Sequence, residues 1–303
     1  MIRFLNYLNY IWKAHLSNAF WKARTARRLQ REGARVSYKT SLLKKYIPYI
    51  TELNIPDEIP SPYDYEADRV FVFWDKGLES APLIVRRCIE SIREVFGDKM
   101  ILLDSSNLSD YVTLPEIILQ KYREGKIGTA HLSDIFRLEL LYKYGGYWYD
   151  ATNFATGPVP SYVKEQDFFL FMSPEDSYTH MYVLNSFLRA KKGDALARMW
   201  HDVLVHYWTH ENKAVDYFCS QMLFRLLVNH NREAATLFSK MPRLSMAPTH
   251  RLWYVEGDKP YDAVLYERIK SEAFFQKCSY RRPRGGLDSF VPGSMARRII
   301  MGE

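Results

Sequence analysis

The segment from Gly128 to Pro160, GTAHLSDIFRLELLYKYGGYWYDATNFATGPVP, most constrains what this chain folds into. Its apolar residues recur at helical spacing and predict a helix from about Ala130 to Tyr144. They are Leu132, Ile135, Phe136, Leu138, Leu140 and Leu141. Gly145 and Gly146 end this helix. The β-prone run Tyr147-Trp148-Tyr149 then places Asp150 at the C-terminal end of a strand, where ligands bind in open α/β sheets.

Two polar residues share one face of the predicted helix. Asp134 and Arg137 are three positions apart, so their side chains are neighbours on the helix surface. One interpretation is an ordinary intrahelical ion pair, worth a few tenths of a kcal/mol. The other interpretation is a pair of ligand-binding groups next to Asp150.

The rest of the chain alternates strands and helices, which predicts an α/β fold with a mostly parallel sheet. We expect strands at Arg69–Trp74, Lys99–Leu103 and Asp167–Met172, and helices at Pro82–Phe96, Pro115–Glu124, Asp194–His210 and Tyr217–Asn229. A chain of 303 residues with 47% hydrophobic residues has enough apolar side chains for a large core. The three cysteines form no C-x-x-C pair, which fits free thiols in a reducing cytosol rather than disulfides or a thiolate metal site.

The positive charge is concentrated at the N-terminus. Residues 1–45 contain eleven Lys or Arg and one acid, a net charge of +10, and because the whole chain carries +7 the remainder carries −3. Phe4, Leu5, Leu8, Ile11, Trp12, Leu16 and Ala19 share one helical face, opposite Asn6, Asn9, Lys13 and Arg24. This basic amphipathic extension suits an anionic membrane surface. The alternative is a helix packed on the protein itself or on a partner chain.

This extension has none of the features of a signal peptide or a membrane span, because polar residues interrupt every apolar run. Nucleic-acid binding is not expected, since the charge is confined to one helix and no nucleic-acid motif occurs. The Pro-rich, acidic stretch 46–67 predicts a linker, and residues 68–303 form the expected catalytic domain.

Several segments resemble one known family. Ser133 to Gly146 and Trp148 to Thr152 match, nearly position for position, the FSDILRLALLYKYGG-like helix and W-x-DAT strand end of bacterial capsular polysaccharide synthesis proteins. These proteins are similar to glycosyltransferase family 32. Further similar segments are Val70 to Gly77, Asn185 to Gly193, Asp216 to Phe218 and Lys277 to Arg281, so the resemblance covers roughly residues 70 to 282. It implies the nucleotide-diphospho-sugar transferase fold called GT-A, which is Rossmann-like.

The resemblance also implies roles for the residues of the strand end. Asp150 takes the first position of the family's Asp-x-Asp motif and contacts sugar or ribose hydroxyls and the metal. Thr152 takes the second position, where a carboxylate commonly binds Mn²⁺ or Mg²⁺. Since a threonine hydroxyl is a neutral, weaker ligand, we expect the divalent cation to bind weakly, with Arg137 neutralising part of the diphosphate charge.

Other residues receive expected roles in binding the UDP-sugar donor. A carboxylate accepts two hydrogen bonds from a vicinal diol, so we assign Asp134 to the donor sugar. Arg137 is expected to hold the diphosphate or to lock Asp134 in place. Trp148 is expected to pack near the uracil or ribose or to be ordinary core. Trp74 and Asp75 follow the first strand and are expected to meet the base, although Asp75 also fits a simple turn.

Four later residues also receive expected roles. Asp216 is either a helix N-cap or a group on the acceptor or sugar side of the site. Lys277 and Ser279 resemble phosphate or metal ligands on a loop that closes over the donor. The alternative for Lys277 is a solvated charge. Asn185 is expected to help position the sugar.

The resemblance implies transfer with retention of anomeric configuration, in which the leaving phosphate takes the acceptor's proton. The expected function is transfer of a hexose from a UDP-sugar to a lipid-linked oligosaccharide or polysaccharide in capsule or exopolysaccharide synthesis. The enzyme is expected in the cytoplasm, peripheral to the inner face of the plasma membrane. The alternatives are a non-catalytic nucleotide-sugar or carbohydrate-binding protein of the same fold, or a transferase acting on a protein or teichoic acid.

Overall fold

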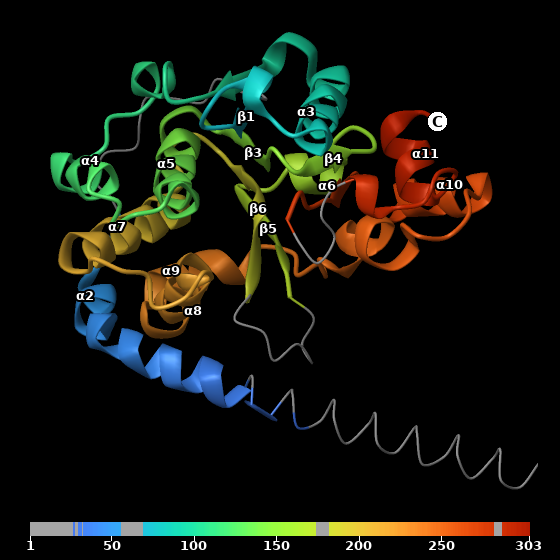
Figure 1. Cartoon of the computed structure of the whole chain (residues 1–303). Coiled ribbons are helices and arrows are strands. Elements are labelled where there is room, and N and C mark those ends of the chain that lie inside the picture. Colours follow the sequence, from blue (N-terminus) through green and yellow to red (C-terminus); the bar gives the residue numbers. More distant parts are fainter. Residues whose placement is uncertain (1–26, 28–29, 32, 56–68, 174–181, 282–286) are drawn as a thin grey trace, which may run out of the picture.

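A computed structural model describes residue 27, residues 30–31, 33–55, 69–173, 182–281 and 287–303. Its centre is a five-stranded sheet in the order β2-β1-β3-β6-β5 (Figure 1). The strands are β1 (Val70–Phe73), β2 (Met100–Leu103), β3 (Gly146–Asp150), β5 (Phe168–Met172) and β6 (Val183–Ala190). Only β6 runs against its neighbours in this sheet, so four of the five strands point the same way. The predicted α/β class with a mostly parallel sheet is confirmed, and it is consistent with a GT-A-like fold.

The register of the sheet places the predicted ligand-binding end of the strands at one edge. Phe73, the last residue of β1, pairs with Asp150, the last residue of β3. Phe73 also pairs with Leu103 at the end of β2. The loops that follow these three strands therefore start at the same edge of the sheet. In open α/β sheets, ligands bind in the crevice at this edge, outside the carboxyl ends of the strands.

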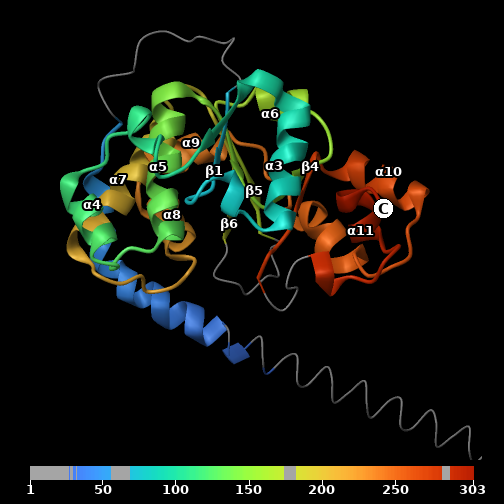
Figure 2. The same ribbon diagram turned by 45° about the horizontal axis from the view of Figure 1, so that its top comes forward.

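Helices cover both faces of the sheet, as Figures 1 and 2 show, with α3 on one side and α5 with α7 on the other. The long helices are α3 (Leu83–Phe96), α5 (Thr129–Tyr144), α7 (Ala195–His210) and α8 (Cys219–His230). Shorter helices are α2 (Ile47–Glu52), α4 (Glu116–Arg123), α6 (Ser161–Lys164), α9 (Arg232–Ser239), α10 (Ala263–Glu272) and α11 (Met295–Met301). The helices and strands predicted between residues 69 and 229 are all present, with ends that differ by one or two residues.

Helix α5 is buried over most of its surface because it lies between the sheet and α7. Its buried residues include the polar Ser133, Asp134 and Arg137 as well as the predicted apolar face. Gly145 ends the helix with a φ of 69°, and its N–H donates to the Leu141 carbonyl at 2.8 Å. The glycine pair therefore ends α5 and leads into β3, as predicted.

A small second sheet brings the C-terminal part of the chain to the end of β3. It consists of β4 (Asn153–Ala155) and β7 (Phe275–Lys277), which are antiparallel. Lys277 pairs with Asn153, three residues after Asp150. The pairing continues where the Cys278 N–H donates to the Thr152 carbonyl at 2.8 Å.

The N-terminal part of the described chain is helical and packs on the body. Residues 33–43 form a helix that continues through a 3₁₀ turn (Lys44–Tyr46) into α2, beside α8. Tyr46 and Ile50 are buried, and the Asn231 amide donates to the Ile50 and Leu53 carbonyls at 2.9 and 2.8 Å. The first residues of the expected linker at 46–67 are thus packed helix, because they carry apolar side chains that α7 and α8 bury.

The predicted amphipathic face at Phe4 to Ala19 lies outside the described residues. Among the residues that the structure describes, no helix is both long and apolar enough to cross a membrane. All three cysteines are buried and free, as expected from their spacing.

Candidate active site

A cavity of about 750 Å³ opens at the carboxyl ends of β1 and β3. Its walls come from the loops after these strands, from α5, β6 and the start of α8, and from the segment after β7. Of the predicted site residues it is lined by Trp74, Asp75, Asp134, Arg137, Trp148, Asp150, Thr152, Asn185, Lys277 and Ser279. The fold thus brings together all the predicted site residues except Asp216.

Arg137 is held rigidly in the wall of this cavity. Its Nε donates to the Ser133 carbonyl at 3.0 Å, its Nη2 to Ser133 Oγ at 2.8 Å and its Nη1 to the Asn185 carbonyl at 2.5 Å. Its guanidinium carbon lies 4.7 Å from the centre of the Trp148 ring. Only 6% of the side chain is exposed, so this buried cation needs the partners that surround it.

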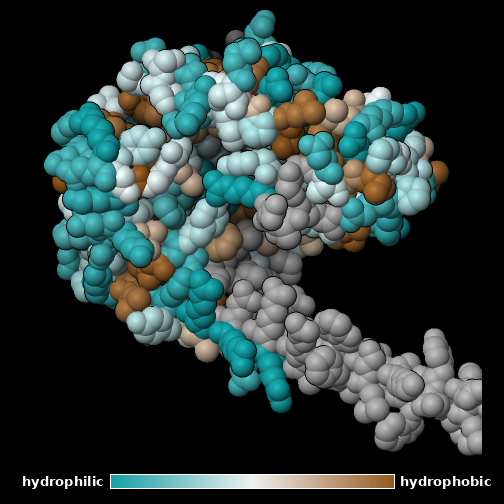
Figure 3. All heavy atoms as spheres, in the orientation of Figure 1, coloured by the Kyte–Doolittle hydropathy of each residue, from teal (hydrophilic) through white to brown (hydrophobic). Residues whose placement is uncertain are grey.

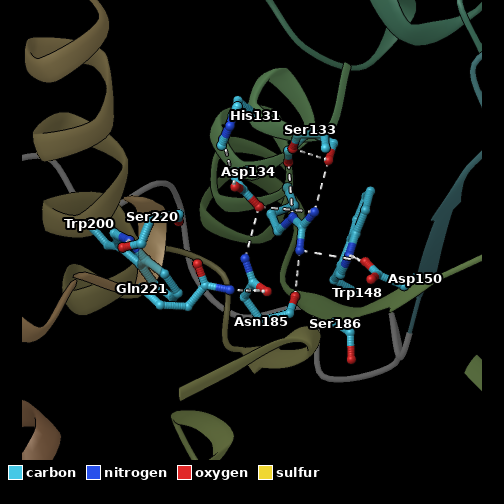
Figure 4. A network of polar contacts seen from close by, with 12 residues as sticks. His131, Ser133, Asp134, Trp148, Asp150, Asn185, Ser186, Trp200, Ser220 and Gln221 are labelled. Carbon is cyan, nitrogen blue, oxygen red and sulfur yellow. Dashed lines mark hydrogen bonds and ion pairs between the residues drawn. The ribbon is translucent and has the colours of Figure 1, made fainter. Parts of the chain in front are cut away.

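Two carboxylates flank this guanidinium. Asp134 Oδ1 lies 3.1 Å from Arg137 Nη2, and Asp150 Oδ1 lies 3.5 Å from Nη1. The intrahelical pair predicted as one interpretation is therefore present, but it faces the cavity instead of bulk solvent. In Figure 4, Asp134 and Asp150 reach the network from α5 and β3.

A chain of amides supports Asp134 from the opposite side. Asn185 on β6 donates to Asp134 Oδ1 at 2.8 Å, and Gln221 on α8 donates to Asn185 Oδ1 at 2.9 Å (Figure 4). The Gln221 side-chain oxygen, Oε1, is buried without a hydrogen-bond partner among the described residues. Asn185 therefore holds Asp134 in place, and Gln221 offers an unused acceptor in the cavity wall.

Asp150 has two hydrogen-bond partners besides its contact with Arg137. It accepts from Trp148 Nε1 at 2.9 Å and from Lys277 Nζ at 2.7 Å. Burial acts to raise its pKa, but the nearby Lys277 and Arg137 charges and these two hydrogen bonds outweigh it and hold the pKa of Asp150 below its ordinary value. The carboxylate is consequently ionised at neutral pH.

The residues expected to meet the base lie at the cavity mouth. The Trp74 ring contacts the Tyr280 ring edge to face, with centres 5.4 Å apart. Asp75 Oδ1 accepts from Ser105 Oγ at 2.6 Å, so its side chain also joins the loop after β1 to the loop after β2. Ser279 lies in the exposed turn that leads to Arg281.

Asp216 does not line the cavity, although its neighbours Tyr217 and Phe218 do. It is also not the N-cap of α8, which begins at Cys219 and has Phe218 as its N-cap; the Asp216 carboxylate accepts from the Phe218 N–H two residues later. Its main partner is Lys39 in the N-terminal helix, and Arg35 Nη2 lies 4.0 Å away. The N-cap interpretation is therefore wrong, whereas the role on the acceptor or sugar side stays a prediction. The ion-pair partner of Asp216 comes from a segment 177 residues away.

The structure adds cavity residues that sequence reasoning missed, among them Gln221 and His250. Burial lowers the pKa of His250, with a backbone hydrogen bond opposing and the Lys277 charge assisting this shift. Gln221 is an interior helix residue and His250 an isolated histidine, so no spacing or motif pointed to either. Tyr217 belongs to the Asp216–Phe218 segment and lines the cavity where Asp216 does not.

The residues expected to hold a divalent cation do not fit one. Between Asp150 Oδ2 and Thr152 Oγ1 lies the Lys277 ammonium, at 2.7 Å from each oxygen. The donor set contains a single carboxylate and a neutral hydroxyl, whereas Mn²⁺ and Mg²⁺ favour several oxygen ligands, carboxylates among them. Within the described residues, no three His, Cys, Asp or Glu side chains are grouped so that they could hold a metal ion.

Comparisons with known proteins add a family and several relatives. A family model described as "Capsular polysaccharide synthesis protein" matches residues 21–289. The glycosyltransferase afumC of Aspergillus fumigatus is 27% identical over 167 residues, covering 48% of this chain and 41% of that protein. The O-glycosyltransferase PaGT of Phomopsis amygdali is 24% identical over 197 residues, covering 58% of this chain and 46% of that protein. The chain thus spans less than half the length of these curated relatives.

One solved structure, the PaToxG glycosyltransferase, is similar over 69% of this chain and 83% of its own, with a TM-score of 0.39 and 15% identity. The curated relatives are fungal, so a bacterial origin stays a prediction.

Proposed function

This chain belongs to the family of capsular polysaccharide synthesis proteins, and from that membership we propose that it is a glycosyltransferase. It transfers a hexose from a UDP-sugar to a lipid-linked oligosaccharide or polysaccharide during capsule or exopolysaccharide synthesis. Glycosyltransferases among its relatives support the reaction class. The UDP-sugar and the acceptor are inferred from the chemistry of the cavity and from the family.

The observation that carries the proposal is a buried guanidinium between two carboxylates in the wall of a large cavity. Arg137 lies beside Asp134 and Asp150, and Lys277 stands on the far side of Asp150. A nucleoside diphosphate sugar brings a diphosphate that needs fixed cations and sugar hydroxyls that donate to carboxylates. One ligand of this class uses both kinds of group at once.

The transfer we propose retains the anomeric configuration. The bond between the sugar's anomeric carbon and the phosphate oxygen breaks, and its electron pair stays on that oxygen. The acceptor hydroxyl forms the new bond to the anomeric carbon, and its proton passes to the departing phosphate. The carboxylates Asp134 and Asp150 each contact a cation or an amide, so they bind and orient the donor, and the transfer needs no separate general base.

The charge distribution supports a proposal for where the enzyme acts. The N-terminal segment carries the excess positive charge, and the side chains of Arg35 and Lys45 are more than half exposed. Figure 3 shows hydrophilic side chains along the described part of this segment. We propose that the protein is cytoplasmic and binds the inner face of the plasma membrane, where a lipid-linked acceptor is presented.

The direct test is a donor-hydrolysis screen with the full chain and a panel of nucleotide sugars, with and without acceptor. Asp150→Asn keeps the size of the side chain but removes the charge opposite Arg137 and Lys277. We expect at least a 100-fold loss of hydrolysis and transfer. Asp98→Asn, at an exposed position outside the cavity, is the matched control and retains activity.

Two further readouts separate the alternatives. NMR of the first product formed reports whether the anomeric configuration is retained. Binding of a nucleotide sugar without any release of UDP, even with a range of acceptors, identifies the chain as a non-catalytic binding protein. Hydrolysis by Asp150→Asn within a few-fold of wild type contradicts the assignment of this cavity.

A further inference from the structure

Lys277 occupies the position between Asp150 and Thr152 where the family resemblance predicts a divalent cation. Its Nζ is 2.7 Å from Asp150 Oδ2 and 2.7 Å from Thr152 Oγ1. The side chain is 18% exposed and lines the cavity. A cation is therefore already held between the first and third residues of the Asp-Ala-Thr sequence, and it is supplied by the chain itself.

The fold fixes this placement. Lys277 is the last residue of β7, and the β4–β7 pairing sets it opposite Asn153, next to Thr152 in the chain. The Cys278 N–H to Thr152 carbonyl hydrogen bond locks the following residue as well. The ammonium thus reaches Asp150 from a paired strand, which gives it a defined position relative to Arg137.

The hydrogen-bonding capacity of the ammonium leaves room for a ligand. A lysine ammonium has three N–H donors and no acceptor. Asp150 and Thr152 take two of these donors. The third can be offered to a phosphate oxygen in the cavity, while Arg137 supplies a second cation on the other side of Asp150.

The charges of the cavity wall agree with an anionic ligand. Its cationic residues are Lys76, Arg137, Lys277 and Arg281, and its acidic residues are Asp75, Asp134 and Asp150. The cationic side chains of the wall outnumber the acidic ones, so the protein itself gives the cavity an excess of positive charge. Thr152 also matters here, because a second carboxylate at that position would add a negative charge and favour a metal ion over an ammonium.

We propose that the Lys277 ammonium replaces the divalent cation, so that this enzyme binds and cleaves a nucleoside diphosphate sugar without metal. The inference rests on the proposed function and names the group that neutralises the leaving diphosphate. The Lys277 ammonium stabilises the charge that develops on the phosphate oxygen, and the acceptor's proton still passes to that oxygen.

The first test uses the wild-type full chain and needs no variant. UDP binding is measured by calorimetry after EDTA treatment and again with added Mn²⁺, and Mn²⁺ binding is followed separately by electron paramagnetic resonance. We expect UDP affinities within about two-fold of each other, because the cation site is already filled. A more than ten-fold loss of affinity after EDTA treatment that Mn²⁺ restores overturns the inference while leaving the proposed function intact.

The second test changes the charge of the side chain. Lys277→Met keeps the length of the side chain and removes the ammonium, and we expect at least a ten-fold weaker UDP affinity. Lys277→Arg keeps the charge and retains part of the affinity. Lys99→Met, at an exposed position away from the cavity, is the matched control and binds UDP like wild type. Wild-type affinity in Lys277→Met overturns the inference, and thermal unfolding shows that each variant is folded.

The third test converts the ammonium site into a metal site. Thr152→Asp combined with Lys277→Ala supplies a second carboxylate and removes the competing ammonium. We expect this double variant to bind Mn²⁺ by electron paramagnetic resonance and to require Mn²⁺ for UDP binding. Mn²⁺ binding by the wild type as tight as by the double variant contradicts the inference. If the wild type binds no nucleoside diphosphate with or without metal, the proposed function itself fails.

Discussion

Arg137 combines a structural and a functional role in one side chain. Its guanidinium donates to two carbonyls, from Ser133 on its own helix and from Asn185 on β6, and lies over the Trp148 ring. These contacts satisfy a charge that would otherwise be costly to bury. The fork of donors is particular to arginine, so a lysine at this position could not tie α5 to β6 in the same way. The cavity therefore has a cation whose position is set before any ligand binds.

Asp194 is a buried acid outside the site, and it makes the stability of the protein depend on pH. It is the N-cap of α7, its Oδ1 accepts from the Ala197 N–H at 2.8 Å, and it is 4% exposed. Burial raises the pKa of Asp194 to about 7, although the cap hydrogen bond and Lys191 oppose this shift. Between about pH 4 and pH 7 the folded carboxyl keeps a proton that the unfolded chain has lost. The free energy of unfolding must therefore fall as the pH rises through this window.

Asp194→Asn tests this dependence, because asparagine still caps the helix but does not titrate. We expect the unfolding free energy of wild type to fall relative to that of the variant by about 1 kcal/mol per pH unit. Denaturant unfolding at several values from about pH 4 to about pH 8 measures it. Asp98→Asn serves as the control, and parallel profiles for wild type and Asp194→Asn would show that the carboxyl titrates normally.

At the scale of elements, the junction between α5 and β3 decides where the site is built. Gly146 has a φ of 96°, and a Cβ there would lie 2.2 Å from the Arg69 carbonyl oxygen. That oxygen accepts from the Tyr147 N–H at 2.8 Å, so it cannot move without breaking the start of the β1–β3 pairing. The close approach of these two strands sets the distance from Arg137 on α5 to Asp150 on β3.

Gly146→Ala is consequently expected to lower the free energy of unfolding by about 3 kcal/mol or more. Gly157→Ala is the matched control, since no atom lies within 4 Å of the added Cβ, and we expect a change of less than about 1 kcal/mol. Urea unfolding compares the two variants. Equal losses would mean that the chain relaxes around Gly146 at little cost.

At the scale of the whole molecule, the N-terminal helix joins the charged extension to the rim of the cavity. Lys39 of this helix forms an ion pair with Asp216, and the next residue, Tyr217, lines the cavity. The extension is therefore packed on the catalytic body through its described residues. Its predicted membrane-binding face precedes this contact in the chain.

Flotation of the full chain with vesicles tests the membrane proposal. We expect binding to anionic vesicles that is lost at high salt, since each Lys or Arg near the surface contributes about 1 kcal/mol. Replacing Lys13, Lys22 and Arg24 by Gln should lower the bound fraction strongly. The matched control replaces the exposed Lys99, Lys164 and Lys240 by Gln and leaves binding unchanged. Binding that ignores lipid charge and salt would contradict an electrostatic interaction with the membrane.

The elements with strong local signals could be predicted, and those without them could not. Periodicity and glycines located α5 and β3, and a buried apolar run located β1. Strand β6 was not predicted, because Asn185, Ser186 and Arg189 interrupt its apolar pattern and only its place between β3 and β5 makes it a strand. The three-residue strands β4 and β7 likewise depend on each other for their hydrogen bonds.

The sequence alone determined the helix, the glycine break and the strand-end acid, because each follows from local periodicity or backbone conformation. It also brought Asp134, Arg137 and Asp150 into one hypothesis, since they are close in the chain. Only the tertiary structure decided which distant cation pairs with each acid. Lys277 forms an ion pair with Asp150, 127 residues away in the chain, and Lys39 forms one with Asp216, 177 residues away. Ion pairs of this kind have no local signal, because the free energy that forms them comes from burial and pairing of whole elements.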